Sequence, residues 1–383
     1  MNKKMVNIPD VLFFQEGPGV RNNQYTSNGV KLLNVANLVD GKVDLSTSDR
    51  YISENEAYGK YKHFLCDDGD FIVASSGIKV EYIDKKMGFV DKSMLPLCMN
   101  TSTIRFKVLN KEQLNIRYFM YYLKSRSFKS QLFKQITGSA QLNYGPSHLK
   151  RMYIPLLSID EQDYIVYFLD KIQTIIDLRK KQLVSLDKLV KARFVEMFGD
   201  PVDNQMGWEK RQLQCLVSDD CSISYGIVKT GDDVDGGIPV FRPVDIVGRV
   251  PKREELKRTT HEISNQYRRS LLTGRDLLVT VRANIADTFI AGQEFKGCNV
   301  GRGIVPIRTN ESIIHLDFLK AQMDFDSMNR HMKALAKGIT LIQLNMEDLR
   351  TVEFIVPPIE KQEQYVAIIQ QIDKSKFVGM NFK

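Results

Sequence analysis

The sequence predicts an α+β protein in which a mixed α/β domain occurs twice and each copy is followed by a helix, the two helices forming an antiparallel coiled coil. Three observations predict this fold. The chain has 383 residues, segments about 200 residues apart resemble each other, and an apolar pattern of coiled-coil spacing separates the copies. The expected boundaries are a first domain at 1–155, a central helix at 156–199, a second domain at 200–355 and a short distal helix at 356–383.

The composition is that of an ordinary globular protein, with 43% apolar and 26% charged residues. Lys and Arg (54) exceed Asp and Glu (46), and the net charge of +8 is a modest hint of a polyanionic partner, although a solvated basic surface explains it equally well. We expect a cytoplasmic protein with no membrane contact, because apolar runs are short and the N-terminus lacks a signal peptide pattern. The five cysteines never form a C-x-x-C pair, so neither disulfides nor a metal site is expected.

The internal repeat is the strongest organisational signal. Matching segments are Gly29–Val43 with Gly237–Val250, the stretches that begin at Gly69 and Gly274, Gln141–Asn143 with Gln343–Asn345, and Leu156–Ile172 with Val356–Ile372. The last pair shares Gln162 and Gln362 at an offset of 200. Similarity is strongest at the end of each copy and weakest in its middle. One part of the domain is therefore kept alike while another part differs.

The central segment has clear helix boundaries. Ser158 and Glu161 form a capping box, while Gly199 and Pro201 end the helix. The residues between them carry a seam with steps of four and three, interrupted by two arginines, and it spans about 50 Å. The seam predicted to dock another helix or subunit comprises Ile165, Leu169, Ile172, Ile176, Leu183, Leu186 and Val190. Its partner is either the distal helix or another chain, and plain dimerisation through a coiled coil is the alternative.

Both domains mix short β-type runs with amphipathic segments, expected around Ile116–Phe133 and Leu316–Leu335. Their loops carry basic side chains of the kind that contact phosphates and base edges. The candidate DNA-binding residues are Arg21, Lys31, Lys79, Lys229, Arg242, Arg249, Arg282 and Arg302. Any one of them is more often an ordinary surface residue. Arg282 and Arg302 are favoured because each lies beside or within an apolar run, where an arginine needs a partner.

Catalytic motifs are scarce. The sequence has no [DN]-P-P-[YF] element, no phosphate-binding G-x-x-x-x-G-K-[ST] loop and no G-x-S-x-G elbow. Asp10 with the later Asp84-Lys85-Lys86 resembles a nuclease signature, but such short matches arise readily by chance. We therefore expect a binding protein without catalytic residues or metal ligands. A self-contained nuclease or methyltransferase is the enzymatic alternative.

The chain resembles the specificity (S) subunit of type I restriction-modification systems. The segments that carry the resemblance are Ile154–Pro201, Ile355–Ile369, Glu16–Tyr25 and Gly237–Ile246. The resemblance implies a non-catalytic subunit with two target-recognition domains, each reading one half of a bipartite double-stranded DNA target. It also implies that the conserved helices form an antiparallel coiled coil, which sets the spacing and docks the partners.

Those partners would be two adenine methyltransferase subunits and, for cleavage of foreign DNA, nuclease-translocase subunits. The resemblance places S-adenosylmethionine, ATP and magnesium on these partners, with no cofactor on this chain. The distal helix departs from the pattern, because its likeness to the central helix stops after Phe377, and a helix as long as the central one would need about 14 residues beyond Lys383. A coiled-coil adaptor without a DNA role and a truncated inactive specificity subunit are therefore the alternatives.

Overall fold

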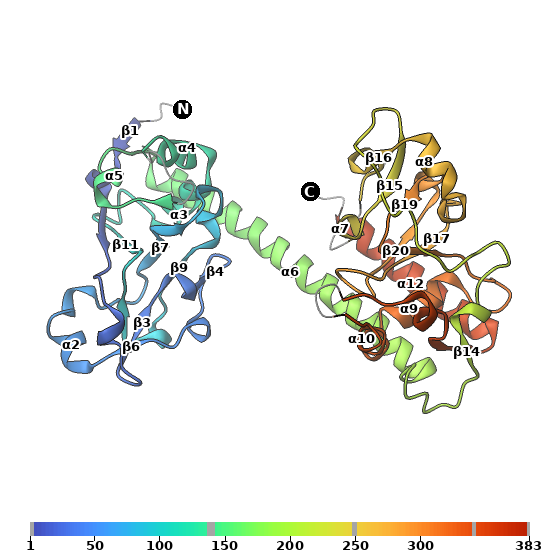
Figure 1. Cartoon of the computed structure of the whole chain (residues 1–383). Coiled ribbons are helices and arrows are strands. Elements are labelled where there is room, and N and C mark those ends of the chain that lie inside the picture. Colours follow the sequence, from blue (N-terminus) through green and yellow to red (C-terminus); the bar gives the residue numbers. More distant parts are fainter. Residues whose placement is uncertain (1–3, 136–141, 247–250, 339–341, 381–383) are drawn as a thin grey trace. The chain divides into compact units, whose positions relative to one another are not determined.

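The chain forms two compact units, Met1–Ile176 and Asp177–Lys383. The computed structural model describes residues 4–135, 142–246, 251–338 and 342–380 (Figure 1). Helix α6, Ile159–Phe198, begins in the first unit and ends in the second. Within the described ranges, no helix is both long and apolar enough to span a membrane.

The main sheet of the first unit is antiparallel and has the strand order β2-β11-β7-β9. Its strands are β2 Leu12–Glu16, β7 Phe71–Ala74, β9 Met87–Phe89 and β11 Thr103–Val108. Every residue of β7 is buried, which explains why this strand is apolar throughout rather than alternating. The rings of Phe71 of β7, Phe106 of β11 and Phe119 of the helix Ile116–Lys124 pack together and form the centre of this core.

A smaller sheet in the same unit has the order β10-β3-β6. Its strands are β3 Val30–Leu33, β6 Tyr51–Ile52 and β10 Leu97–Met99, and β3 runs parallel to β10. Two-stranded pairings complete the unit: β1 Lys4–Asn7 with β13 Tyr153–Leu156, β4 Leu38–Val39 with β5 Lys42–Val43, and β8 Ser76–Ile78 with β12 Leu142–Asn143.

The first amphipathic segment is broken into two helices, α3 Ile116–Lys124 and α4 Arg126–Gln135. Ser125 between them has extended backbone angles, and its hydroxyl accepts a hydrogen bond from the Phe128 amide at 3.2 Å. This serine therefore ends one helix and caps the next. The remaining helices of the unit are α1 Ile8–Val11, α2 Glu54–Tyr58 and α5 Pro146–Leu149.

The second unit repeats this plan. An antiparallel sheet has the order β18-β17-β20, and a smaller sheet has the order β16-β15-β19 with β15 parallel to β19. The strands are β14 Lys210–Gln212, β15 Ile238–Phe241, β16 Lys257–Thr259, β17 Asp276–Thr280, β18 Thr288–Ala291, β19 Asn299–Val300, β20 Ile304–Ile307 and β21 Glu353–Ile355. The helices are α7 Pro243–Ile246, α8 His261–Gln266, α9 Leu316–Met323, α10 Asp326–Ala334, α11 Met346–Arg350 and α12 Ile359–Met380.

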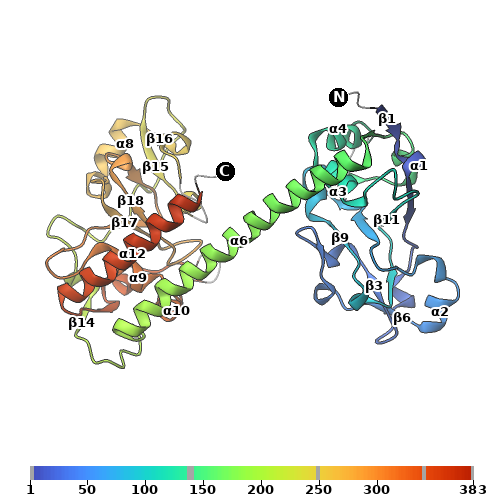
Figure 2. The same cartoon turned by 180° about the vertical axis from the view of Figure 1, so that it is seen from behind.

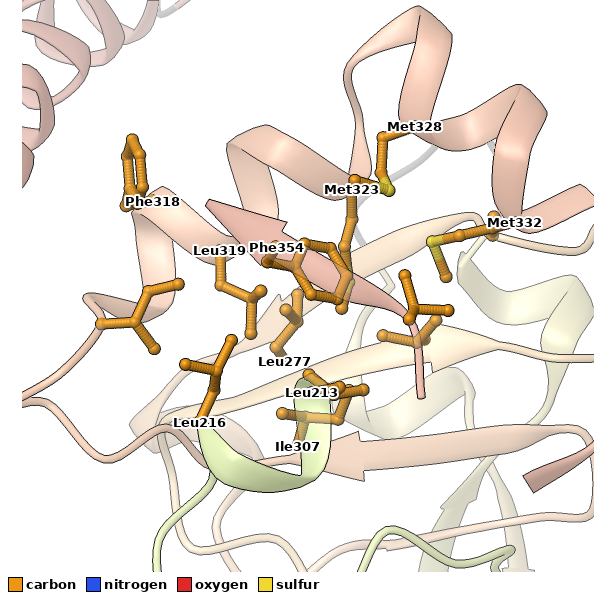
Figure 3. Packing of buried hydrophobic residues seen from close by; sticks show 14 of the residues in the cluster. Leu213, Leu216, Leu277, Ile307, Phe318, Leu319, Met323, Met328, Met332 and Phe354 are labelled. Atoms are coloured by element: carbon orange, nitrogen blue, oxygen red, sulfur yellow. The ribbon is translucent and has the colours of Figure 1, made fainter. Parts of the chain in front are cut away.

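The second unit has a continuous apolar core around α9. Figure 3 shows its buried side chains, in which Phe318, Leu319 and Met323 of α9 belong to one cluster with Leu277 of β17 and Ile307 of β20. Burying each such side chain contributes roughly 1.5–3 kcal/mol. As in the first unit, the amphipathic segment is two helices rather than one, here α9 and α10.

The antiparallel helix pair expected from the sequence is present in the second unit (Figure 2). Lys376 of α12 pairs with Asp187 of α6 at 2.8 Å, while Tyr365 donates through its hydroxyl to the Val190 carbonyl at 3.4 Å. Because the later residue of α12 contacts the earlier residue of α6, the two helices run antiparallel. The Tyr365 ring also lies 5.4 Å from the Phe194 ring, which anchors the end of α6 in the core.

Candidate nucleic-acid interface

In each unit, two parallel strands of the smaller sheet end side by side and present loop residues at the same edge. We call these residues the carboxyl edge. They are Asn34 and Asn100–Ser102 after β3 and β10 in the first unit, and Arg242 and Gly301–Gly303 after β15 and β19 in the second. Loops held by a rigid sheet are common places for binding residues.

Two buried asparagines stiffen the carboxyl edge of the first unit. Asn100 donates through Nδ2 to Asn34 Oδ1 at 2.8 Å, and its Oδ1 accepts from the Thr101 amide at 2.8 Å. Asn34 in turn donates to the Leu32 carbonyl at 3.0 Å. Because these amide groups are used internally, they shape the edge and leave contact with a ligand to their neighbours.

Beside this pair lies a polar hollow of about 380 Å³. Arg50 lies over the ring of Tyr25 at 5.2 Å and donates to its hydroxyl at 3.4 Å. Arg50 and Thr101 are exposed, while Ser102 is half-buried. The hollow therefore offers one cation, an aromatic ring and hydroxyl groups to solvent. It is lined by Tyr25, Asn34, Val35, Ala36, Thr47, Ser48, Arg50, Asn100, Thr101 and Ser102.

The carboxyl edge of the second unit is more basic. Arg242 donates through Nε and Nη2 to the two carboxylate oxygens of Asp245 at 3.0 and 2.9 Å. This hydrogen-bonded carboxylate is buried, and it raises the pKa of the Arg242 guanidinium above its ordinary value. Asp245 thereby fixes the side chain of Arg242, which is still 44% exposed.

Arg282 reaches the same edge from the loop after β17. A Cβ built on Gly303 would lie 3.2 Å from Arg282 Cβ and 3.2 Å from Pro243 Cγ, so the three backbones meet closely. Arg282 donates through Nη2 to Gln343 Oε1, while its buried Nε has no hydrogen-bond partner among the described residues. Arg302, next to Gly303, is exposed, and its side chain has no partner in the part of the chain that the structure describes.

The structure thus brings together three of the eight candidates, Arg242, Arg282 and Arg302. Lys229 is exposed in the loop that precedes β15, and Arg249 lies outside the described residues. In the first unit Arg21 and Lys79 are exposed at separate loops. Lys31 donates to Asp49 at 2.7 Å, and this hydrogen bond raises the pKa of its ammonium group.

Sequence reasoning missed Arg50, Asn100, Thr101 and Gln343. The internal repeat held the signal for Thr101, because it follows β10 as Arg302 follows β19. Arg50 and Gln343 reach their positions through pairings that no short motif marks.

Comparison with known proteins identifies the family. The model of the type I restriction modification DNA specificity domain matches residues 2–188 and 226–378.

The chain belongs to this family.

Two curated proteins illustrate the relationship. This specificity-domain protein is 22% identical over 300 residues to the type I restriction enzyme EcoBI specificity subunit of Escherichia coli, an alignment that covers 72% of this chain and 62% of the relative. It is 24% identical over 367 residues to the putative type I restriction enzyme MjaX specificity subunit of Methanocaldococcus jannaschii, which covers 90% of this chain and 80% of the relative.

Solved structures share the fold. A chain from a structure on complex assembly and conformational transition of the type I R-M system has a TM-score of 0.57 at 19% identity, covering 99% of this chain and 93% of that chain. The type I restriction-modification S subunit from M. genitalium has a TM-score of 0.52 at 14% identity, covering 99% and 92%. The antiparallel helix pair and duplicated domains are thus features of a known architecture.

The predicted docking seam of the specificity-domain protein divides between its two units. Ile165 and Leu169 are half-buried in the first unit, where Ile172 and Ile176 are exposed, while Leu183, Leu186 and Val190 are half-buried in the second. Several further apolar side chains of α6 are exposed: Tyr164, Tyr167, Phe168, Ile175 and Leu178.

The nuclease-like pair does not gather a metal site in the described ranges. Asp84 is held by Lys129 at 2.7 Å, and no group of three or more acidic, histidine or cysteine side chains could hold a metal ion among the residues described.

Proposed function

We propose that the protein is the DNA-recognition subunit of a type I restriction-modification complex. In this proposal each unit is a target-recognition domain that reads one half of a bipartite double-stranded DNA target. The observation that carries the proposal is the duplicated carboxyl edge, which has the same backbone in both units and different side chains. A duplicated reader with changed contacts is suited to an asymmetric target, since base-contacting side chains determine sequence preference.

Catalysis belongs to partner subunits in this proposal. Two adenine methyltransferase subunits would use S-adenosylmethionine, and nuclease-translocase subunits would use ATP and magnesium. The exposed apolar residues of α6 support a docking role, since Tyr164 and Phe168 are 66% and 46% exposed and their rings lie 4.6 Å apart. Exposed aromatic pairs of this kind are enriched where proteins bind one another.

The proposal is tested by co-expressing the full chain with the methyltransferase subunit from its own source in a host that lacks adenine methylation. Methyladenine is then mapped across the genome. A bipartite motif with a fixed gap is the expected result. The partner expressed alone, and the partner with a full-length relative of this chain, are the controls.

A domain exchange assigns each half of the motif. Replacing residues 1–155 with the equivalent domain of a relative is expected to change one half and leave the other half intact. Methylation without any motif, or no methylation while the relative supports it, contradicts the proposed function.

A further inference from the structure

We propose that Arg282 and Arg302 read guanine in the half-site bound by the second unit, and that their counterparts Ser76 and Thr101 give the first unit a different preference. This inference rests on the proposed function and names the residues that would distinguish the two half-sites.

Backbone hydrogen bonds define the counterparts. The Asn100 amide donates to the Leu33 carbonyl at 3.0 Å, and the Gly301 amide donates to the Phe241 carbonyl at 2.8 Å. Both bonds join the ends of the parallel strand pair, so the next residue, Thr101 or Arg302, occupies one equivalent position.

The second match comes from the other side of the edge. The Tyr144 amide donates to the Ser75 carbonyl at 3.0 Å, and the Leu344 amide donates to the Val281 carbonyl at 2.9 Å. Ser76 and Arg282 follow these carbonyls, and they pair with Asn143 and Gln343 respectively. A serine in one unit is therefore replaced by an arginine in the other.

The surroundings of Arg282 are those of a side chain held ready for a ligand. Its buried Nε donor has no partner among the described residues, although buried donors are normally satisfied. The loop that carries it holds Ala283 and Ala286 at φ +61° and +65°, a strained conformation for alanine that clusters at functional sites. Gly303, at φ +102°, lies close to the stem of Arg282, because a Cβ at this position would be 3.2 Å from Arg282 Cβ, a tight contact.

The chemistry of the two edges then differs. A guanidinium group presents parallel N–H donors that match the O6 and N7 acceptors of guanine in the major groove. Arg302 is exposed and can present these donors. Arg242 is not assigned a guanine, because Asp245 already accepts hydrogen bonds from its Nε and Nη2 and neutralises its charge. In the first unit the Ser76 hydroxyl donates to the Ser102 hydroxyl at 2.6 Å, and hydroxyl groups pair with any base.

The test uses the complex with its methyltransferase partner and the motif mapped above. R302K and R282K keep the positive charge but lose the planar fork, so they are expected to relax a guanine of the second unit's half-site toward all four bases. The other half-site is expected to stay unchanged. R330K, at an exposed arginine of α10 in the same unit, is the matched control and should leave the whole motif unchanged.

Atomic substitution in DNA gives an independent readout. Replacing that guanine by 7-deazaguanine removes only the N7 acceptor and should weaken binding of the unaltered complex about tenfold. The R302K or R282K complex should lose this sensitivity. T101R, at an exposed position of the first unit, is expected to add a guanine preference to the other half-site, and a misfolded domain would not produce such a gain.

The outcomes separate the two proposals. Absence of any motif with the unaltered chain refutes the proposed function. A motif without guanine in the second unit's half-site, or a motif that R302K and R282K both leave unchanged in stably folded complexes, overturns the guanine assignment alone.

Discussion

Gln162 and Gln362 make the same three hydrogen bonds in the two units. Each buried side chain donates to two carbonyls and accepts from one amide, and each set of partners is shifted by 200 residues. The partners are Gln113 O at 2.8 Å, Leu157 O at 2.9 Å and Asn115 N at 2.9 Å for Gln162, and Ile313 O at 3.1 Å, Pro357 O at 2.8 Å and His315 N at 3.0 Å for Gln362. Each glutamine therefore ties the first turn of a long helix to the chain that precedes α3 or α9.

Replacing Gln362 by leucine should destabilise the second unit. The substitution leaves two carbonyls and one amide without partners in the interior, which lowers the free energy of unfolding by about 3 kcal/mol. Trp208 is the only tryptophan of the chain and packs on Phe198 in this unit, so its fluorescence during urea unfolding reports the loss. Q370L, at an exposed position of the same helix, is the control. Equal midpoints for the two variants would contradict the role of Gln362.

A buried arginine should have an equally local effect in the first unit. Arg105 donates to Asp70 at 3.1 Å, to the Leu65 carbonyl at 2.7 Å and to the His63 carbonyl at 2.9 Å. R105M removes one of the two cations that pair with the buried Asp70, since Lys107 Nζ stays 3.2 Å from the other carboxylate oxygen, and it leaves the two carbonyls without this donor. The unfolding free energy of this unit should fall by about 2–3 kcal/mol. Hydrogen exchange of residues 1–155 measures the change.

Trp208 fluorescence reports the unfolding of the second unit. Its urea midpoint should be the same in R105M as in the unaltered chain. K111M, at an exposed lysine, should leave both readouts unchanged. A shift confined to the tryptophan signal would show that Arg105 does not stabilise the first unit.

The helices and the repeat could be predicted from the sequence because their signals are local. Ser158 and Glu161 form the expected capping box, with the Ser158 amide donating to Glu161 at 3.0 Å. The shared glutamines mark the repeat at its constant offset. The breaks within the two amphipathic segments are harder to predict. In the first segment the helical spacing of apolar residues continues past Ser125, although the helical backbone is interrupted there.

Strand pairing could not be read in the same way, because it depends on residues far apart in the chain. The short Gln-Leu-Asn match aligns Asn345 with Asn143 and Gln343 with Gln141, which lies outside the described residues. The hydrogen bonds to the Ser75 and Val281 carbonyls show instead that Tyr144 corresponds to Leu344. That match was therefore wrong by two residues. The partner of Arg282 lies 61 positions away at Gln343, a distance at which a single sequence gives no pattern.

One of the five cysteines should react with a thiol reagent much faster than the other four in the native protein. Cys215 is exposed, whereas Cys66, Cys98, Cys221 and Cys298 are buried. Burial raises the pKa of Cys66 and of Cys98 to about 12, so almost none of either thiol is ionised at pH 8. Since the thiolate is the reactive form, native protein should take up one equivalent of iodoacetamide rapidly and five after unfolding. C215S should abolish the rapid phase, and rapid labelling of a second thiol would contradict the buried assignments.

Asp245 should mask the charge of Arg242. The counterpart of Asp245 in the first unit is Asn37, whose Oδ1 accepts from the Asn34 amide at 3.0 Å, as Asp245 accepts from the Arg242 amide at 2.8 Å. An asparagine in D245N can accept the hydrogen bond from the Arg242 amide in the same way as Asn37 does in the first unit. The unfolding free energy should therefore fall by no more than about 2 kcal/mol. The substitution does remove the carboxylate that pairs with the guanidinium, so Arg242 becomes free to contact a phosphate.

Binding of non-specific duplex DNA by the D245N complex should then depend more steeply on salt, by about one unit in the slope of log affinity against log salt. D232N removes the same charge from an exposed aspartate and is the matched control. If both variants change the slope equally, the effect is one of net charge, and the pairing with Asp245 does not restrain Arg242.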